Sequence, residues 1–292
     1  MQSQLIHLFD SQLEKWELAR RNFSELASVR VRELNVRGVD LQVHFNPARI
    51  KSSSAKIDAK SLAERPCFLC KKNRPEVQEE ILWRDYALLI NPYPILPQHF
   101  TVPHQTHKLQ EILPHFSDML DLATLLPDFL VFYNGPESGA SAPNHFHFQA
   151  GTKNFLPLVK QRNVVEKQKI CSSVFLWKNY LRTVLEIVGN QKNDVISAFL
   201  DIYAKLPIVG SEPMMNVLSF YENSSWHVLI LPRKAFRPWQ YNAEKESERL
   251  MVSPGTAEMC GIIITPIEEH FERITSEDIE DIFSQVSLEI NW

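Results

Sequence analysis

The sequence predicts an α+β fold in which antiparallel sheets are flanked by helices. Three observations support this prediction. Apolar residues recur at helical spacing in a few long segments, of which residues 5–28 are the first. In residues 30–46, apolar and polar residues instead alternate as in the strands of a hairpin. Residues 81–103 follow the order strand, turn, strand. A second pair of strands, within residues 215–233, echoes this layout in the other half of the chain, so we expect two related α+β units.

The composition is that of an ordinary globular protein. The 292 residues are 44% hydrophobic and 23% charged, with a net charge of −4, and they suffice for one large domain or two modest ones. The mild negative charge gives no electrostatic footprint for nucleic acid. No stretch approaches the roughly 18 apolar residues of a membrane span. The first residues lack a basic region followed by an apolar run, so we expect a cytoplasmic protein without a signal peptide.

The N-terminal elements are a helix, a hairpin and three short strands. Residues 5–28 carry apolar side chains near helical spacing, which predicts one amphipathic helix that covers the body. The hairpin at 30–46 is followed by a polar, serine-rich loop at 46–54. The proline-rich segment 91–97 cannot continue a sheet and separates the later strands. These strands are expected at residues 81–83, 86–90 and 99–102.

The middle of the chain is expected to be mostly helical. Residues 107–126 have a helical pattern and precede the buried strand 129–133. Residues 155–205 contain one or two helices, clearest at 173–189 and 193–205. These helices are expected to connect and pack the two units.

The C-terminal elements are predicted as strands followed by a helix. The strand pair within 215–233 ends in Leu-Pro-Arg, which echoes Thr-Val-Pro-His at residues 101–104. A further strand is expected at 262–264. Residues 266–288 end the chain with a helix for which Thr275 is a plausible cap.

The stretch from Asn134 to Gln149 is the most informative part of the sequence. It runs through a Gly/Ser segment into His-Phe-His-Phe-Gln, which alternates polar and aromatic residues. In a strand, His145, His147 and Gln149 would project from one face while the phenylalanines anchor the other. A single histidine in a strand is usually structural. Two histidines at this spacing, beside a Gly/Ser loop, indicate a functional site.

The His-x-His-x-Gln motif resembles the transferase branch of the histidine-triad superfamily. That branch includes galactose-1-phosphate uridylyltransferase, diadenosine tetraphosphate phosphorylase and the GDP-hexose phosphorylases. The resemblance implies that His147 is the nucleophile that attacks the α-phosphorus of a nucleotide. The hydrolase branch carries a further histidine where this chain has Gln149, which favours group transfer or phosphorolysis over hydrolysis. The resemblance to the transferase branch also implies two histidine-triad-like units, of which the second is degenerate and has no His-x-His motif.

The implied chemistry suits these residues. A neutral imidazole is a good nucleophile near pH 7, and covalent catalysis divides one displacement at phosphorus into two easier ones. The Gln149 amide can donate a hydrogen bond to a phosphate oxygen at any pH. Backbone N–H groups of residues 138–141 can form a concavity for a second phosphate.

Several residues are expected to bind the nucleotide. By resemblance, Asn91 in the proline-rich loop contacts the ribose. Arg49, in Asn-Pro-Ala-Arg, contacts phosphate by the same resemblance, although it also suits a solvated loop. Around the motif, the expected nucleotide and phosphate ligands are Asn134, Ser138, Gly139, Ser141 and Asn144. Arg233, Lys234 and Arg237 follow a predicted strand and serve either as phosphate ligands or as surface charge.

A Cys-x-x-Cys knuckle at Cys67 and Cys70 is half of a zinc site, because Zn²⁺ normally takes four nitrogen or sulfur ligands. A thioredoxin-like redox pair and a reduced, metal-free knuckle are the alternatives. Resemblance to the uridylyltransferases implies that a histidine near residue 107 and the first histidine of the motif, His145, complete the site. We prefer His107 to His104 as the third ligand. Such a zinc ion would be structural and would fix His147 in place. With Cys171 and Cys260, the scattered cysteines suit a reduced protein.

We therefore expect a nucleotidyltransferase or phosphorylase that forms a covalent nucleotidyl-histidine. The favoured substrate is a nucleoside diphosphate-sugar, GDP-hexose in particular, with phosphate or a sugar phosphate as acceptor. The alternatives are a dinucleoside polyphosphate phosphorylase, a hexose-1-phosphate uridylyltransferase and a non-catalytic nucleotide-binding protein. We expect neither nucleic-acid nor membrane binding, and a homodimer stays open. The expected division is an N-terminal helix (1–28), a catalytic domain (29–160), a helical connection (161–205) and a second domain (206–292).

Overall fold

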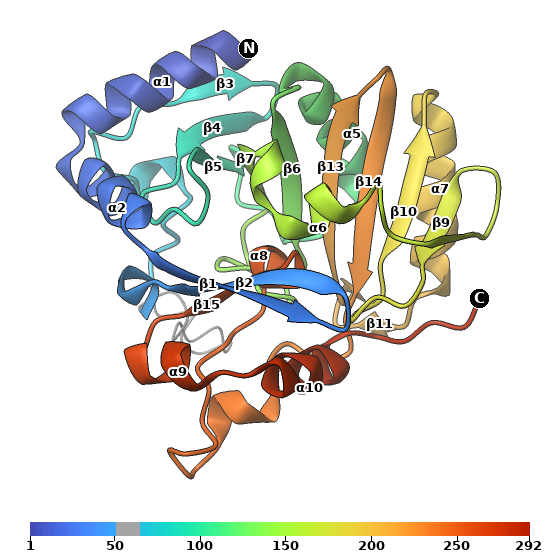
Figure 1. Ribbon diagram of the computed structural model, residues 1–292. Coiled ribbons are helices and arrows are strands. Elements are labelled where there is room, and N and C mark those ends of the chain that lie inside the picture. The colour runs from blue at the N-terminus through green and yellow to red at the C-terminus, as the bar shows by residue number, and fades with distance from the viewer. Residues whose placement is uncertain (51–64) are drawn as a thin grey trace.

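The computed structural model describes residues 1–50 and 65–292. Its centre is a ten-stranded sheet with the order β3-β4-β5-β7-β6-β13-β14-β10-β9-β8 (Figure 1). Every adjacent pair of strands in this sheet is antiparallel. The predicted α+β class with an antiparallel sheet is therefore confirmed.

The two halves of the sheet have the same order of elements. The first half contains β3 (Ile81–Trp83), β4 (Tyr86–Ile90), β5 (His99–Pro103), α5 (Phe116–Leu125), β6 (Phe129–Asn134) and β7 (His147–Thr152). The second contains β8 (Lys167–Lys169), β9 (Val174–Trp177), β10 (Leu185–Gly189), α7 (Lys192–Lys205), β13 (Met215–Glu222) and β14 (Ser225–Pro232). The strand order is mirrored about the central pair β6 and β13, so β14 takes the place that β7 has in the first half.

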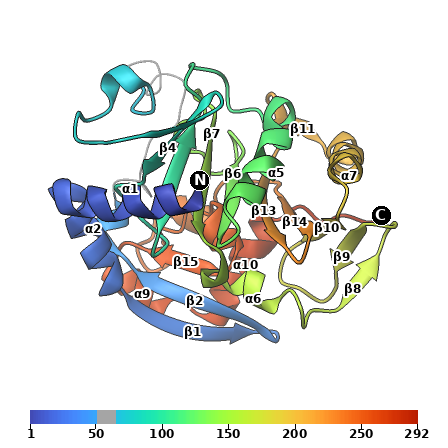
Figure 2. The same ribbon diagram turned by 90° about the horizontal axis from the view of Figure 1, so that it is seen from above.

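The two faces of the large sheet are covered differently (Figure 2). Helices α5 and α7 lie on one face, and α1 also contributes to the hydrophobic cluster there. The other face carries a small sheet with the order β1-β2-β15 and the C-terminal helices. These elements are β1 (Arg30–Val36), β2 (Val39–Phe45), β15 (Ile262–Thr265), α8 (Thr256–Met259), α9 (Glu268–Arg273) and α10 (Ser276–Val286). The remaining short elements are α6 (Pro157–Gln161), β11 (Ile208–Val209) and β12 (Glu212–Pro213).

The N-terminal segment forms two helices, α1 (Gln2–Lys15) and α2 (Glu17–Ala27), where one helix was expected. Trp16 separates them in an extended conformation, with φ −111° and ψ 98°, and its side chain is buried. The bend lets both apolar stripes reach the body. Helix α2 is attached to the proline-rich loop, because Asn22 Nδ2 donates a hydrogen bond of 2.6 Å to the Pro92 carbonyl.

The predicted hairpin at 30–46 is confirmed as β1 and β2. Arg37 and Gly38 join the strands, and both have the positive φ that such a tight turn requires. The polar loop that follows begins with a 3₁₀ turn, η1 (Pro47–Arg49). Residues 51–54 of that loop lie outside the described residues. The strand expected at 262–264 is present and pairs in parallel with β2.

Two helix predictions in the middle of the chain need correction. The helix expected at 107–126 begins only at Phe116, after the 3₁₀ turn η3 (Leu113–His115). The helix expected at 173–189 is wrong, since this segment forms β9 and β10, and β10 pairs with β14. Leu185 and Ile187 are fully buried in the sheet, so tertiary pairing overrides the local helical pattern. Part of the expected helical connection therefore consists of strands.

The other helix predictions hold. Helix α7 occupies the expected 193–205 segment. Thr275 caps α10, with its Oγ1 accepting a hydrogen bond from the Asp278 N–H while the Asp278 carboxylate accepts one from the Thr275 N–H. Among the described residues, no helix is long and apolar enough to cross a bilayer.

Candidate functional site

The His-x-His-x-Gln motif straddles the start of β7. The strand begins at His147, and His145 lies in the turn before it, where its N–H donates to the Ala142 carbonyl over 3.0 Å. Phe146 and Phe148 are fully buried in the cluster under α5, as expected. Gln149 pairs with Phe132, which belongs to the opposite cluster. His147 and Gln149 therefore face the side of the large sheet that carries the small sheet.

Hydrogen bonding fixes the tautomer of His147. Its Nδ1 lies 2.9 Å from the carbonyl oxygen of His145, which can only accept, so Nδ1 carries the proton. The unprotonated Nε2 makes no hydrogen bond with any residue that the structure describes. Burial is the main cause that lowers the pKa of His147 to about 4; the hydrogen bond with the His145 carbonyl opposes this shift, and the charge of the His145 ring adds to it. The ring is therefore neutral near pH 7, with a lone pair on Nε2.

Gln110 holds the start of β7. The β6–β7 ladder extends only to the pair Phe132 and Gln149, so the strands separate beyond it. There the buried Gln110 amide accepts a 2.8 Å hydrogen bond from the His147 N–H and donates to the carbonyls of His147 and Asn134, both at 3.0 Å. One side chain thus replaces the missing ladder bonds and fixes the backbone of His147.

His99 orients the Gln149 amide. The His99 Nδ1 accepts a 3.1 Å hydrogen bond from the Ile95 N–H, so the proton is on Nε2. That Nε2 lies 2.9 Å from Gln149 Oε1 and donates to it. The Gln149 NH₂ group is then left to donate elsewhere. Burial lowers the pKa of His99 to about 3, although the bond with Gln149 opposes this, so the donor is a neutral ring.

The Gly/Ser loop packs directly against the loop before α8. Gly139 has φ +98°, and a Cβ there would lie 2.9 Å from the Cα of Gly255, so the two backbones need glycine at this contact. Ser138 is fully buried, and its hydroxyl has no hydrogen-bond partner among the described residues. Ser141 is exposed, and its carbonyl accepts a 2.7 Å hydrogen bond from Arg65. Asn144 is partly exposed beside the motif.

Asn134 is a hub of protein contacts. Its Oδ1 accepts hydrogen bonds from Asn216 Nδ2 at 2.8 Å and from the N–H and hydroxyl of Thr256 at 2.9 and 2.7 Å. Arg233 Nη1 donates to Asn216 Oδ1 and to the Pro254 carbonyl. The idea of Arg233 as a phosphate ligand or surface charge is wrong. Its side chain is 1% exposed and its remaining donors also bind backbone carbonyls.

Arg49 and Asn91 meet at the proline-rich loop. Arg49 Nη1 donates a 2.9 Å hydrogen bond to the Tyr93 carbonyl, and Asn91 Oδ1 accepts one from the Tyr93 N–H. Asn91 also lies beside His99, with 3.4 Å between Asn91 Nδ2 and His99 Nε2. Both residues expected to bind the nucleotide thus lie next to the pair His99 and Gln149.

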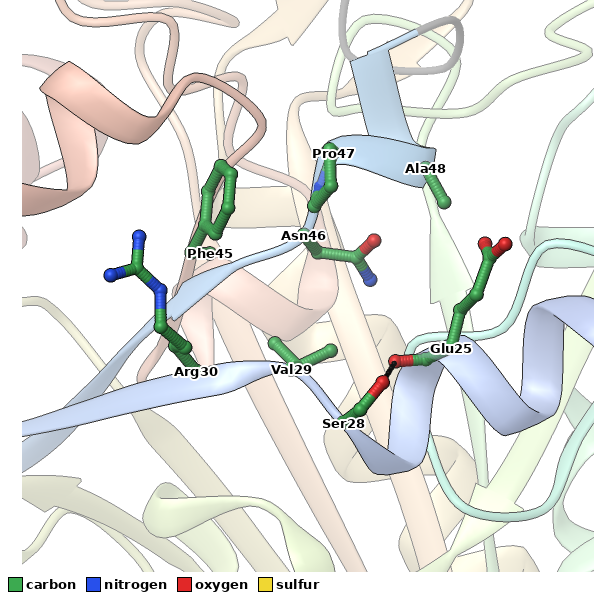
Figure 3. Close-up of a pocket in the computed structure, with 8 residues that line it drawn as sticks. All are labelled: Glu25, Ser28, Val29, Arg30, Phe45, Asn46, Pro47 and Ala48. Atoms are coloured by element: carbon green, nitrogen blue, oxygen red, sulfur yellow. Dashed lines mark hydrogen bonds between the residues drawn. The ribbon is translucent and has the colours of Figure 1, made fainter.

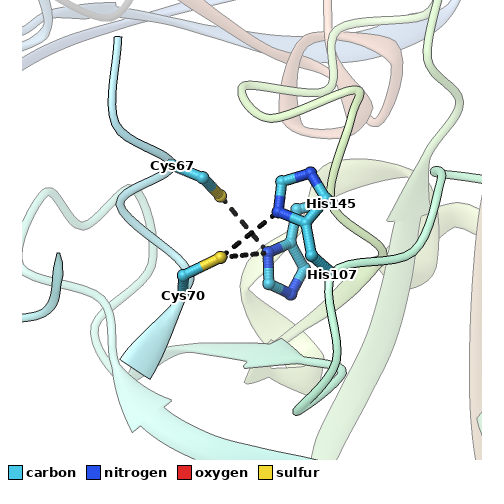
Figure 4. Close-up of side chains that lie close together, drawn as sticks. All are labelled: Cys67, Cys70, His107 and His145. Carbon is cyan, nitrogen blue, oxygen red and sulfur yellow. Dashed lines mark hydrogen bonds between the residues drawn. The ribbon is translucent and has the colours of Figure 1, made fainter. Parts of the chain in front are cut away.

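The cysteine knuckle and two histidines form a cluster (Figure 4). The ligand atoms of Cys67, Cys70, His107 and His145 all lie within 4.8 Å of one another. His145 Nδ1 is 3.2 Å from Cys67 Sγ and 3.5 Å from Cys70 Sγ, and His107 Nδ1 is 3.2 Å from Cys70 Sγ. Cys67 is buried enough to raise its thiol pKa, but hydrogen bonds from His145 and from the backbone lower that pKa to about 7.

This cluster fits a zinc ion. Tetrahedral zinc with Zn–S of about 2.3 Å and Zn–N of about 2.05 Å separates sulfur from nitrogen by roughly 3.6 Å, close to the spacings found. His145 Nε2 donates a 2.8 Å hydrogen bond to the His104 carbonyl, which leaves Nδ1 unprotonated for a metal. The structure therefore favours His107 over His104 as the third ligand, with His104 supporting His145 through its backbone.

Two residues of this site, His99 and Gln110, were not singled out from the sequence. His99 lies at the start of a predicted strand, and only the strand register brings its ring to Gln149. Gln110 lies in a segment that was expected to be helical. Its role depends on the separation of β6 and β7, which no local pattern reveals.

Comparison with known proteins identifies the fold. The family described as a domain of unknown function (DUF4922) matches residues 8–152. No curated protein matches the chain. Yeast Ap4A phosphorylase Apa2 in complex with Ap4A matches with a TM-score of 0.64 and 16% identity, over 96% of this chain and 97% of that one.

Two further crystal structures of yeast Apa2 agree with this match. One has a TM-score of 0.60 and 16% identity, over 92% of this chain and 97% of that chain. The other, in complex with AMP, has a TM-score of 0.56 and 17% identity, over 94% and 96%. At this identity the likeness concerns the fold. The chain thus has the fold of yeast Ap4A phosphorylase Apa2 over most of its length.

Proposed function

We propose that this protein transfers a nucleotidyl group through a covalent intermediate on His147. The observation that carries this proposal is the tautomer of that ring, since Nδ1 donates to the His145 carbonyl and Nε2 keeps its lone pair. Nucleophilic catalysis requires such a group, held in place and unprotonated at neutral pH. The bonds from Gln110 to the His147 backbone supply the rigidity.

The reaction has two displacements at one phosphorus. Nε2 of His147 attacks the α-phosphorus, and the bond between that phosphorus and the bridging oxygen breaks, which releases the other half of the substrate as a phosphate. Inorganic phosphate or a sugar phosphate then attacks the same phosphorus, and the phosphorus–nitrogen bond breaks to restore the ring. The Gln149 NH₂ group, oriented by His99, donates to a non-bridging oxygen in both steps.

The substrate is a nucleotide with a phosphoanhydride bond. The complexes of yeast Apa2 with Ap4A and with AMP support nucleotides as a class. The GDP-hexose hypothesis rests on the motif Asn-His-Phe-His-Phe-Gln, which is similar to that of the GDP-hexose phosphorylases. A dinucleoside polyphosphate is the second candidate, because the matched fold is that of an Ap4A phosphorylase.

The expected nucleotide contacts divide into two groups. Arg49, Asn91 and Asn144 lie near the motif and are partly exposed residues. Ser138 is buried, and the Asn134 oxygen already accepts hydrogen bonds from Asn216 and Thr256. We therefore assign both residues a role in stabilising the loop. Gly139 acts by allowing the close contact with the loop before α8.

A zinc ion held by Cys67, Cys70, His107 and His145 would have a structural role. Its positive charge would hold the cysteine knuckle and the turn before β7 together, because both segments provide ligands. His145 belongs to both parts, since its ring faces the cysteines while its carbonyl accepts from His147. We also propose that the second half is a degenerate unit, because β14 takes the place of β7 and carries no His-x-His.

Intact mass spectrometry tests the proposal. Wild type and His147→Ala are mixed near neutral pH with GDP-glucose, UDP-glucose, ADP-glucose or diadenosine tetraphosphate, without an acceptor. A gain of one nucleoside monophosphate in wild type alone supports the mechanism and names the base. His44→Ala, which removes another buried histidine, serves as the matched control and should label like wild type. Binding of nucleotide by wild type without a mass gain or turnover would favour the non-catalytic alternative.

A further inference from the structure

Arg65 connects the cysteine knuckle to the Gly/Ser loop that precedes His147. Its Nη2 donates a 2.7 Å hydrogen bond to the Ser141 carbonyl. Its guanidinium also lies 5.6 Å from the centre of the ring of Phe68, which belongs to the knuckle. Two contacts therefore hold a partly exposed cation beside this loop. Neither the attack on phosphorus nor the metal cluster described above uses this side chain.

The segments that hold Arg65 also hold the nucleophile. The Ala142 carbonyl accepts a 3.0 Å hydrogen bond from the His145 N–H, and the His145 carbonyl accepts one of 2.9 Å from the His147 ring. On the other side, His145 Nδ1 lies 3.2 Å from the sulfur of Cys67, two residues after Arg65 in the chain. The loop and the knuckle thus meet at the turn before His147, and Arg65 joins them at their surface.

The positive charge of Arg65 is not balanced by an ion pair with any residue that the structure describes. Other arginines in comparable places are committed. Arg30 borders a cavity of about 230 Å³ at the end of α2 (Figure 3) and pairs with two carboxylates of α9, at 2.6 and 3.0 Å. In the knuckle, Arg74 pairs with Glu80 at 2.7 Å. The charge of Arg65 is therefore available to an anion.

The Gly/Ser loop adds backbone donors to this charge. The N–H groups of Gly139, Ser141 and Asn144 make no hydrogen bond within residues 1–50 and 65–292. Gly139 has φ +98°, and backbone N–H groups around a residue of positive φ form concavities that bind anions. A guanidinium carries five N–H donors, of which the Ser141 carbonyl takes one. The loop and Arg65 together have the donors that a phosphate requires.

Arg49 and Arg65 lie on opposite sides of the reaction centre. Arg49 and the expected ribose contact Asn91 are at the proline-rich loop, beside the histidine ring that orients Gln149. Gln149 follows His147 in β7, whereas the loop that holds Arg65 precedes it. With the nucleoside on the side of Asn91 and the α-phosphorus at His147, the next phosphate of the substrate extends toward Arg65.

We propose that Arg65 binds the phosphate group that leaves the α-phosphorus and the phosphate group that later attacks it. This inference rests on the proposed function, since it takes His147 as the nucleophile. The second displacement reverses the first with a new phosphate, so one site serves the departing and the entering group. Hydrogen bonds between a guanidinium and phosphate are charge-assisted and stronger than those of neutral donors. Arg65 thereby favours substrates that carry a second phosphate over nucleoside monophosphates.

Binding to the His147→Ala protein tests this proposal without turnover. Isothermal titration calorimetry compares AMP with ADP and GMP with GDP. Adding Arg65→Ala should weaken diphosphate binding by about tenfold or more and leave monophosphate binding unchanged, which also shows that the variant folds. Arg65→Lys should keep much of the gain from the second phosphate. Arg65→Gln keeps a donor for the Ser141 carbonyl but should lose the gain. Lys72→Ala removes another exposed cation of the knuckle and should change neither affinity.

A second measurement concerns the entering phosphate. In protein that retains His147, the concentration of inorganic phosphate needed to discharge the nucleotidyl-histidine should rise about tenfold in Arg65→Ala. An unchanged concentration would overturn the shared site.

Four binding results would overturn the proposal. Arg65→Ala could weaken mono- and diphosphates equally, which would mean that Arg65 only shapes the loop, or it could change neither. Arg65→Gln could keep the gain, or Lys72→Ala could match Arg65→Ala, which would indicate a general effect of surface charge. A nucleotide mass gain in wild type together with any of these results would leave the proposed function intact. A gain from the second phosphate that depends on Arg65, without any covalent intermediate, would support the phosphate site and refute the mechanism. Absence of binding by all four nucleotides would refute both.

Discussion

Replacing His107 with alanine should weaken zinc binding by this protein, whereas replacing His104 should not. Both histidines lie in the segment after β5, and only the structure distinguishes them. His107 Nδ1 lies 3.2 Å from Cys70 Sγ, within the cluster of four ligand atoms. The His104 ring instead turns toward Thr106, with Nδ1 at 2.9 Å from its hydroxyl, and only its backbone supports His145.

The size of the effect follows from the number of ligands. A structural zinc site with four protein ligands contributes about 10–16 kcal/mol at neutral pH, so one ligand accounts for roughly 2.5–4 kcal/mol. Loss of His107 should therefore weaken zinc binding by about 10²–10³-fold. Because a zinc ion at this cluster would join the knuckle to the turn before β7, the melting temperature should fall as well.

Zinc content and affinity can be measured directly. Elemental analysis should find one zinc per chain in wild type and in His104→Ala, and competition with a chromophoric chelator should rank the affinities. Chelator should lower the melting temperature of wild type more than that of His107→Ala. Equal loss of zinc from both variants would refute the assignment of His107. Absence of zinc from wild type would refute the site, and an unchanged zinc affinity in His107→Ala would refute His107 as a ligand.

Three other predictions concern the strands around the site. Gly151→Ala should destabilise the fold by about 1–3 kcal/mol in urea unfolding, because the new Cβ would lie 2.1 Å from Leu96 Cδ1. Adding Leu96→Ala to this variant should restore part of the lost stability. A Gly151→Ala protein as stable as wild type would contradict this packing. His99→Phe and Gln149→Ala should each slow nucleotidyl transfer by about 10²-fold in single-turnover assays, and a double variant slower than Gln149→Ala alone would show that His99 does not act through that amide. Burial raises the pKa of Glu212 from 4.5 to about 7, so the folded state holds a proton that the unfolded state releases. The contribution of Glu212 to stability should be complete below pH 4.5 and should fall by about 3 kcal/mol as the pH rises from 4.5 through 7. Urea titrations that compare wild type with Glu212→Gln should show this difference, and an equal pH dependence in the variant would exclude Glu212 as its source.

The sequence correctly predicted the elements that are determined by residues close together in the chain. The hairpin β1–β2 has alternating residues and a two-residue turn with Gly38, and both signals act within a few residues. The cap at Thr275 likewise depends on a contact three residues away. Such elements form wherever the rest of the chain lies, so their prediction needed no tertiary information.

Predictions failed where distant partners decide the structure. The segment that forms β9 and β10 looks helical by itself, but its position beside β14 makes it a continuation of the sheet. The break at Trp16 has the same origin, because burial of the indole bends a segment with an uninterrupted helical pattern.

The candidate site likewise has features that the sequence predicted and features that depend on the tertiary structure. The sequence by itself determined the chemical groups, since the motif supplies two histidines and a glutamine, and the knuckle supplies two thiols. Only the tertiary structure decided which histidine joins the thiols, which ring orients Gln149 and which amide holds His147. These contacts join residues that are distant in the chain, and their geometry depends on strand register, a property of the packed sheet rather than of any local segment.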